Sequence, residues 1–100
     1  MMPTLSAYAN TENTSLIILK EKGYRVWFDE KIEMYGAEKD GWDFLANSVT
    51  ELVGVIGIYE YHGSPKEYKE YWWKIDQPWL IESVPNQKPD YIAVYEKSKT

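Results

Sequence analysis

The sequence contains no cysteine, which excludes disulfide bonds, thiol catalysis and cysteine-based metal sites. It contains one histidine, and a lone histidine without cysteine does not make a typical structural zinc site. No apolar run approaches the roughly eighteen residues of a membrane span, and the first ten residues lack the pattern of a secretory signal. We therefore expect a cytoplasmic protein without a membrane partner, metal or cofactor.

Basic residues are also few: 11 lysines and arginines stand against 16 acidic residues, a formal net charge of −5. They are scattered along the chain, whereas nucleic acids and anionic membranes favour clustered basic side chains. The composition thus predicts no nucleic-acid partner, and a basic protein is the partner that the charge favours.

Aromatic residues are what the chain has in abundance, with five Trp, nine Tyr and two Phe among 100 residues. Disordered chains are poor in such residues, and this length suits a single domain. We expect one domain over residues 1–100, with a loose beginning at 1–12 and a flexible tail at 97–100.

The N-terminal half predicts a helix followed by three strands. The helix fits Thr14 to Lys22, with Gly23 as a left-handed C-terminal cap. Leu16 and Leu19 would face inward, and Ile18 could join them. Alternating side chains then indicate strands at residues 24–30, 32–38 and 42–46. The Lys39–Gly41 segment is a strong signal for a tight hairpin, because Asp-Gly readily adopts positive φ angles.

A second helix is predicted from Val49 to Tyr61. Ser48 and Glu51 have the spacing of a capping box, and Leu52, Ile56 and Tyr59 would face the core. Two glycines on this helix, Gly54 and Gly57, would let it lie close on the sheet. The β-branched residues of the same segment leave a buried strand as the alternative.

A third helix is predicted from Pro65 to Ile75, because Ser64 and Glu67 repeat the capping spacing and Pro65 suits the first helical position. Its apolar stripe would consist of Tyr68, Tyr71, Trp72 and Ile75. A proline-punctuated connection follows, and Tyr91 to Glu96 alternates as a last strand. The predicted fold class is α+β: a small antiparallel β-meander of about three strands, with a fourth from the C-terminal segment, packed against two or three helices.

Two aromatic side chains stand out as candidate contacts. Trp73 lies off the predicted stripe: Lys69 could cover its ring, Trp79 or the following loop could fold over it, or it could anchor a partner. His62 could act as a general base with Glu60 or Asp76, although a cation at a helix end is the preferred interpretation. The candidate partner-contact residues are Trp73, Lys69, Trp79, Tyr61 and His62.

Catalytic templates find no match in the chain. The acidic residues between Asp29 and Asp43 are scattered over two strand faces and two turns, which does not suit paired-carboxylate chemistry. The GVIG segment at Gly54–Gly57 lacks the lysine and hydroxyl of a phosphate loop, and no nucleophile elbow is present. We expect a protein that is not an enzyme.

The segment AEKDGWDFLANSVTELVGVIGIYEYHG, Ala37 to Gly63, resembles the central part of a family of short uncharacterised bacterial proteins, a domain of unknown function. In that family an AEKDG-type strand leads through an alanine and a polar cap into a helix similar to ELLGLIGIYEY. Val53 and Val55 stand where leucines would be expected. The resemblance implies a strand followed by a helix and a bacterial cytoplasmic setting, and it transfers no functional residue.

The functional expectation is a small acidic protein-interaction module, in its sharpest form an immunity-like or inhibitory protein that binds a basic toxin or nuclease. Net negative charge steers such an association, and many Tyr and Trp residues suit an interface. The alternative is a structural homo-oligomer, such as a homodimer, that buries its surplus aromatic residues against a second copy.

Overall fold

The structure is a computed structural model that describes residues 4–97. The chain divides into two units, Ser6–Trp73 and a second unit that holds residues 74–97 with residues 4 and 5. The first three residues of the stretch predicted to be loose, and the last three of the predicted flexible tail, lie outside the described residues.

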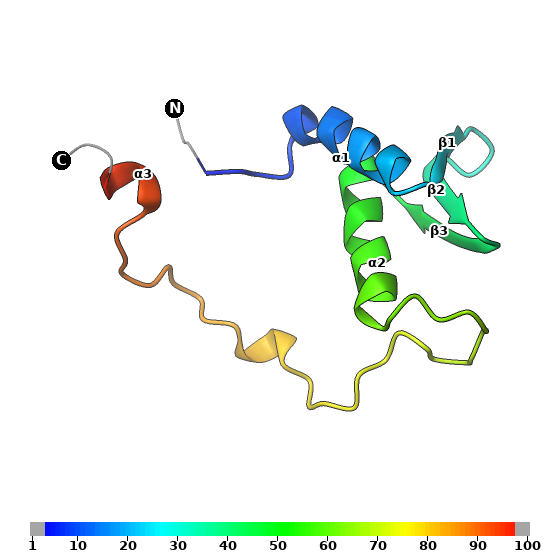
Figure 1. The fold of residues 1–100 in the computed structure, drawn as a ribbon. Coiled ribbons are helices and arrows are strands. Elements are labelled where there is room, and N and C mark those ends of the chain that lie inside the picture. The colour runs from blue at the N-terminus through cyan, green and yellow to red at the C-terminus, as the bar shows by residue number, and fades with distance from the viewer. Residues whose placement is uncertain (1–3, 98–100) are drawn as a thin grey trace. The chain divides into compact units, whose positions relative to one another are not determined.

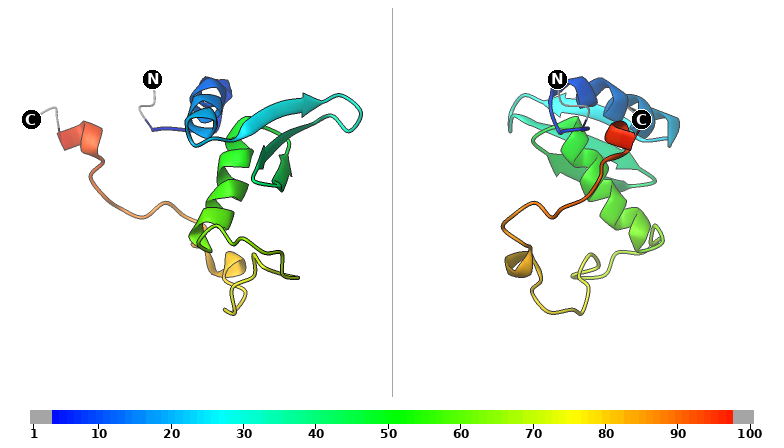
Figure 2. Two further views of the ribbon diagram at one scale, coloured as in Figure 1. Left: turned by 45° about the vertical axis from the view of Figure 1, so that its right-hand side comes forward. Right: turned by 90° about the vertical axis from the view of Figure 1, so that its left-hand side faces the viewer.

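The Ser6–Trp73 unit is a three-stranded antiparallel sheet with two long helices, which confirms the predicted α+β class. The strands lie in the order β1-β2-β3, and both helices cover the same face of the sheet (Figures 1 and 2). In chain order the elements are α1 (Ala9–Glu21), β1 (Arg25–Asp29), β2 (Met34–Lys39), β3 (Trp42–Ala46) and α2 (Val49–Tyr61).

Helix α1 begins at Ala9, within the stretch predicted to be loose, and ends at the predicted glycine cap. Gly23 has a φ of 95°, its amide donates to the Lys20 carbonyl, and the next amide, of Tyr24, donates to the Leu19 carbonyl (both 3.0 Å). This is the Schellman pattern, which satisfies the last carbonyls of a helix. Leu19 is buried as predicted, whereas Ile18 is exposed and does not face the core.

The hairpin between β2 and β3 is the predicted tight turn. Asp40 and Gly41 have φ angles of 53° and 86°, which lets Lys39 pair directly with Trp42. The predicted second strand is shorter than expected, because Ile32 belongs to the β1–β2 turn, where Glu33 has a φ of 53°.

Helix α2 has the predicted bounds, so the buried-strand alternative is wrong. Its N-terminus carries most of the predicted capping box: the Ser48 hydroxyl accepts from the Glu51 amide, but the Glu51 carboxylate accepts from the Asn47 amide rather than that of Ser48 (both 3.1 Å). Its buried stripe is the predicted one, and the core comprises Leu19, Tyr24, Ala37, Phe44, Ala46, Val49, Leu52, Ile56 and Tyr59.

Gly54 and Gly57 do not have the predicted role. Both are exposed, and a Cβ atom at either position would meet nothing within 4 Å. Helix α2 therefore lies on the sheet through Leu52 and Ile56, and its glycines are on the opposite side.

The second unit has little regular structure. Its proline-punctuated connection contains one helical turn as predicted, η1 (Ile81–Ser83), but the predicted last strand is instead a short helix, α3 (Val94–Lys97). The strand prediction fails there because local hydrogen bonds, such as the one from the Glu96 amide to the Ala93 carbonyl at 3.0 Å, satisfy the backbone without a sheet edge. Among the described residues no helix is long and apolar enough to cross a membrane.

Candidate functional site

The candidate site lies where α2 ends and the chain turns back along the domain. Gly63 (φ 81°) and Ser64 (φ 49°) both adopt the left-handed conformation, and their amides donate to the carbonyls of Glu60 and Tyr59. This is the same Schellman cap that ends α1. It directs residues 62–73, which we call the aromatic loop, back across the end of the helix.

The aromatic loop packs on the core through Trp72, and its Tyr68 ring lies 6.4 Å from the ring of Trp42. Trp72 is half-buried, and its ring centroid lies 5.3 Å from that of Trp42 and 5.9 Å from that of Tyr59, both edge-on. The Tyr59 hydroxyl also donates a long hydrogen bond to the Pro65 carbonyl at 3.4 Å. Such edge-on aromatic pairs contribute about 0.5–1.5 kcal/mol each beyond the burial of their area.

The predicted helix over Pro65 to Ile75 is therefore wrong. Ser64 is in the left-handed region and cannot serve as an extended N-cap, and Tyr71 (φ 59°) is left-handed as well. Of the predicted apolar stripe only Trp72 packs on the core, while Tyr68 and Tyr71 are 72% and 61% exposed and Ile75 is exposed too. Packing of Trp72 onto Trp42 and Tyr59 thus outweighs the local helix signals.

His62 lies inside the aromatic loop as a structural link. Its Nε2 atom lies 2.9 Å from the carbonyl oxygen of Trp73, which can only accept, so this nitrogen donates. The imidazole ring also makes edge-on contacts with Tyr61 and Trp72. The hydrogen bond closes the loop by joining its first residue to its last.

The predicted partner-contact residues divide between the two units. Tyr61, His62, Lys69 and Trp73 lie in or beside the aromatic loop, whereas Trp79 belongs to the second unit and is exposed there. Trp73 is 49% exposed, and its ring neighbours are Tyr71 and Trp72. Within the described part of the chain Lys69 makes no cation–π contact with Trp73, so that interpretation of Trp73 is wrong.

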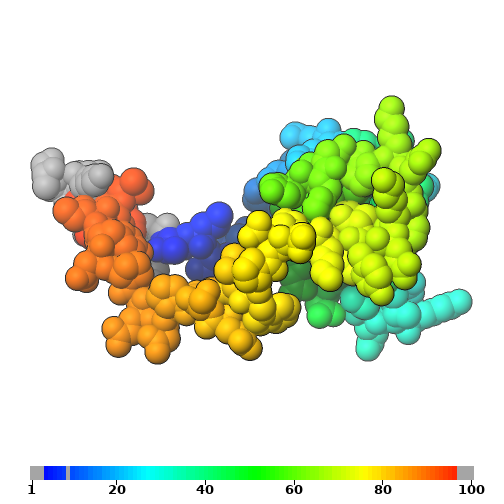
Figure 3. Space-filling model, turned by 90° about the horizontal axis from the view of Figure 1, so that it is seen from below, coloured from blue at the N-terminus to red at the C-terminus, as the bar shows by residue number. Residues whose placement is uncertain are grey.

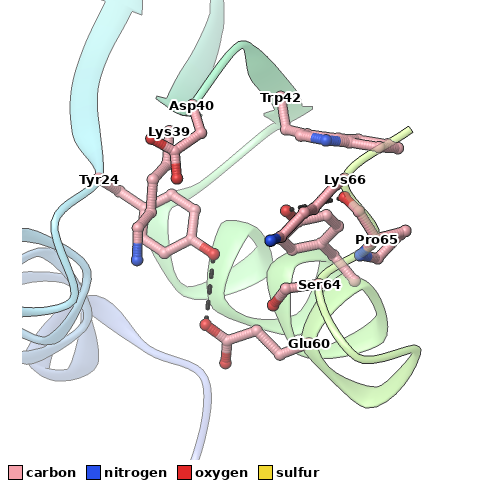
Figure 4. Close-up of a pocket in the computed structure, with 9 residues that line it drawn as sticks. Tyr24, Lys39, Asp40, Trp42, Glu60, Ser64, Pro65 and Lys66 are labelled. Carbon is pink, nitrogen blue, oxygen red and sulfur yellow. Dashed lines mark hydrogen bonds between the residues drawn. The ribbon is translucent and has the colours of Figure 1, made fainter. Parts of the chain in front are cut away.

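A cavity of about 400 Å³ opens beside the aromatic loop (Figure 4). It is lined by Tyr24, Lys39, Asp40, Trp42, Tyr59, Glu60, Ser64, Pro65 and Lys66. Three secondary-structure junctions bring these residues together: the end of α1, the β2–β3 turn and the end of α2. Only the folded domain assembles them.

One carboxylate ties two walls of this cavity together. Glu60 accepts from the Lys22 ammonium at 2.6 Å and from the Tyr24 hydroxyl at 3.3 Å. Burial, followed by the negative charge of Glu60, raises the pKa of Tyr24 to about 12. The Tyr24 hydroxyl therefore stays protonated and acts as a hydrogen-bond donor across the ordinary range of pH.

Sequence reasoning missed the cavity residues as a group. The sequence predicts Tyr59 in the core, and it places Asp40 in a turn and among the scattered acidic residues between Asp29 and Asp43. The sequence does predict that three of the cavity residues lie together, because a tight Asp-Gly hairpin places Asp40 beside Lys39 and Trp42. No local pattern connects these residues to Glu60 or Lys66.

Over residues 4–97 no group of three or more His, Asp or Glu side chains could hold a metal ion. Comparison of the chain with models of protein families, with curated proteins and with solved structures finds no significant match in any of the three. The site consists of exposed aromatic rings, held to the core through Trp72, beside a cavity that is lined by both aromatic and charged side chains.

Proposed function

We propose that this protein is a non-enzymatic protein-interaction module that binds its partner through the aromatic loop and the adjoining end of α2. The observation that carries the proposal is the contrast between the two sides of the loop. Trp72 is anchored on Trp42 and Tyr59, while Tyr61, Tyr68, Tyr71 and Trp73 are 74%, 72%, 61% and 49% exposed.

Large aromatic rings on a fixed backbone are efficient contact groups, because few rotatable bonds are immobilised when they bind. Trp and Tyr are accordingly enriched among the residues that dominate interface energies. The yellow-green segment that follows α2 forms part of the molecular surface in Figure 3. The net charge of −5 favours a basic partner by electrostatic steering.

In its sharpest form the proposal is an immunity-like or inhibitory protein of the bacterial cytoplasm that binds a basic toxin or nuclease. The acidic charge and the exposed aromatic loop support the binding role, and the resemblance of Ala37 to Gly63 to short bacterial proteins bears only on the bacterial setting.

The experiment that tests the proposal is affinity capture from the native host at low salt. We expect the wild-type chain to retain one basic protein in stoichiometric amount, and we expect a Tyr71→Ala/Trp73→Ala double variant to lose it. Trp27→Ala, which removes an exposed ring from β1, is the matched control and should retain the partner. Absence of a stoichiometric partner, or its full retention by the double variant, would contradict the proposal.

A structural homo-oligomer is the second candidate, and one observation favours it. The sheet face opposite the helices carries a short apolar row in which Trp27 and Leu45 flank Gly36, and both side chains are exposed. Light scattering over a range of concentrations tests this candidate. A mass that rises to a dimer and falls back in Trp27→Ala supports it, and a strict monomer at high concentration rules it out.

A further inference from the structure

The cavity beside the aromatic loop combines aromatic walls with carboxylates. Trp42, Tyr59 and Tyr24 contribute rings, and Asp40 and Glu60 contribute carboxyl groups. A second hollow of about 340 Å³ shares Asp40, Trp42 and Lys66 with the first and adds Asp43 and Tyr68. The indole of Trp42 thus lines two adjoining hollows together with three carboxylates from the β2–β3 hairpin and α2.

The charged side chains around the cavity differ in whether they already have a hydrogen-bond or ion-pair partner. Lys39 is engaged, because its ammonium donates to the Lys22 carbonyl at 2.8 Å. Glu60 is engaged by Lys22 and Tyr24. Asp40 differs from both: in the part of the chain that the structure describes, its carboxylate has no hydrogen-bond or ion-pair partner.

The negative charge of Asp40 nevertheless reaches into the cavity. After burial, it is the leading cause that raises the pKa of the Tyr59 hydroxyl, and it also contributes to the raised pKa of Tyr24. Two hydroxyl groups on different walls therefore respond to the same unpaired carboxylate.

The side chains of two lysines, Lys39 and Lys66, already line this cavity. The Lys39 ammonium lies 5.3 Å from the centroid of the Tyr24 ring, a cation–π contact. Lys66, an exposed residue of the aromatic loop, directs its side chain into the cavity in Figure 4 rather than away from it. Lys66 has no ion-pair partner among residues 4–97, so an incoming cation could replace it without breaking a salt bridge.

We propose that this cavity receives the guanidinium group of an arginine side chain from the protein partner, between the Trp42 ring and the Asp40 carboxylate. Arginine fits better than lysine because its planar, weakly hydrated group can stack on an indole while it donates in parallel to a carboxylate. This inference rests on the proposed interaction function and names the chemistry that the partner must present.

The test is a titration of the wild-type protein with N-acetyl-arginine amide, followed by NMR at the indole N–H of Trp42, which a Trp42→Phe variant assigns. The neutral isostere N-acetyl-citrulline amide is the matched probe. We expect weak, saturable binding of the arginine probe that shifts the Trp42 signal, with no comparable shift from citrulline. Equal shifts from the two probes, or no shift from either, would overturn the inference.

Two variants with opposite expected signs identify the groups responsible. Asp40→Asn keeps the turn, since Asn-Gly suits the same hairpin as Asp-Gly, and should weaken binding of the arginine probe about three- to tenfold. Lys66→Gln removes the competing cation and should tighten binding about two- to threefold. Glu30→Gln, in the turn at the opposite end of β2, is the control and should leave the affinity unchanged.

Weaker binding in Lys66→Gln would mean that the cavity favours an anion, and unchanged binding in Asp40→Asn would remove the carboxylate from the site. Either result overturns the inference. Because the arginine probe replaces the partner, this test is independent of the capture experiment. If a partner is captured but the Trp42 signal does not shift, the proposed function stands and the cavity site is wrong. If the Trp42 signal shifts but no partner is captured, the cavity site stands and the proposed function is wrong.

Discussion

The carboxylate of Glu12, in the first turn of α1, caps the backbone of Thr50, in the first turn of α2. Its two oxygens accept from the amides of Val49 and Thr50 at 3.0 and 2.9 Å. Ser48 accepts from the next amide, that of Glu51. The first three amides of α2, which have no partner within the helix, are therefore all satisfied, two of them by a residue distant in sequence.

Loss of this contact should destabilise the fold. We expect Glu12→Gln to lower the free energy of unfolding by about 1 kcal/mol, because the amide offers one acceptor oxygen and no charge to the helix N-terminus. Urea denaturation measures the loss. Glu21→Gln, which removes an exposed carboxylate from the last turn of α1, is the control and should change stability little. Equal stability of the two variants would show that the cap is unimportant.

The same contact predicts a pH dependence. Hydrogen bonds, first of all the one from the Thr50 amide, hold the pKa of Glu12 below its ordinary value of 4.5. A carboxyl group whose pKa is lowered in the folded state contributes stability above its unfolded pKa, and this contribution is lost as the pH falls through the folded pKa. The stability difference between wild type and Glu12→Gln should therefore be present at neutral pH and shrink below pH 4.5. A constant difference would contradict this assignment.

At alkaline pH the relevant group is Tyr24. Its pKa is raised to about 12 in the folded protein from 10.0, so the folded state holds the proton more tightly than the unfolded state. The resulting stability is fully present below pH 10 and is lost as the pH rises toward 12. Tyr24→Phe should therefore lose less stability between these pH values than wild type. The control is Tyr61→Phe, at an exposed position, which should behave like wild type.

Glycine substitutions should have opposite effects at two sites. Gly41→Ala places a side chain at a φ of 86° and should destabilise by roughly 1–2 kcal/mol. Gly57→Ala lies in the middle of α2 with open space around its Cβ position and should stabilise by about 0.5–1 kcal/mol. Thermal unfolding compares the two. A destabilised Gly57→Ala would mean that this face of α2 is covered.

Neighbouring tryptophans of the aromatic loop should also differ. Trp72→Ala removes the ring that packs on Trp42 and Tyr59 and should lower stability by about 2 kcal/mol or more. Trp73→Ala should lower stability by less than about 1 kcal/mol, since half of its side chain is exposed. Acrylamide quenching provides a second measurement: Trp73→Ala should remove an accessible part of the emission. Unchanged quenching would show that Trp73 is covered.

Much of the Ser6–Trp73 unit follows from local pattern. Gly23 and the Asp40-Gly41 pair predict their turns because few other residues adopt positive φ, and Ser48 predicts the start of α2 because its hydroxyl caps the first turn. The same rules fail at Ser64. There the serine, proline and glutamate spacing is present, but the Schellman cap of the preceding helix already imposes a left-handed conformation.

The amino-acid sequence by itself determined the order of the elements from α1 to α2, the two-residue hairpin and the inward stripe of Leu52, Ile56 and Tyr59, because these depend on backbone preferences and on periodicity within a few residues. The tertiary structure alone decided the use of Glu12 as a cap, the course of the aromatic loop and the cavity around Trp42. Each of these depends on contacts between residues that lie far apart in the chain. The free energy of such contacts outweighs local backbone preferences only once the domain has folded.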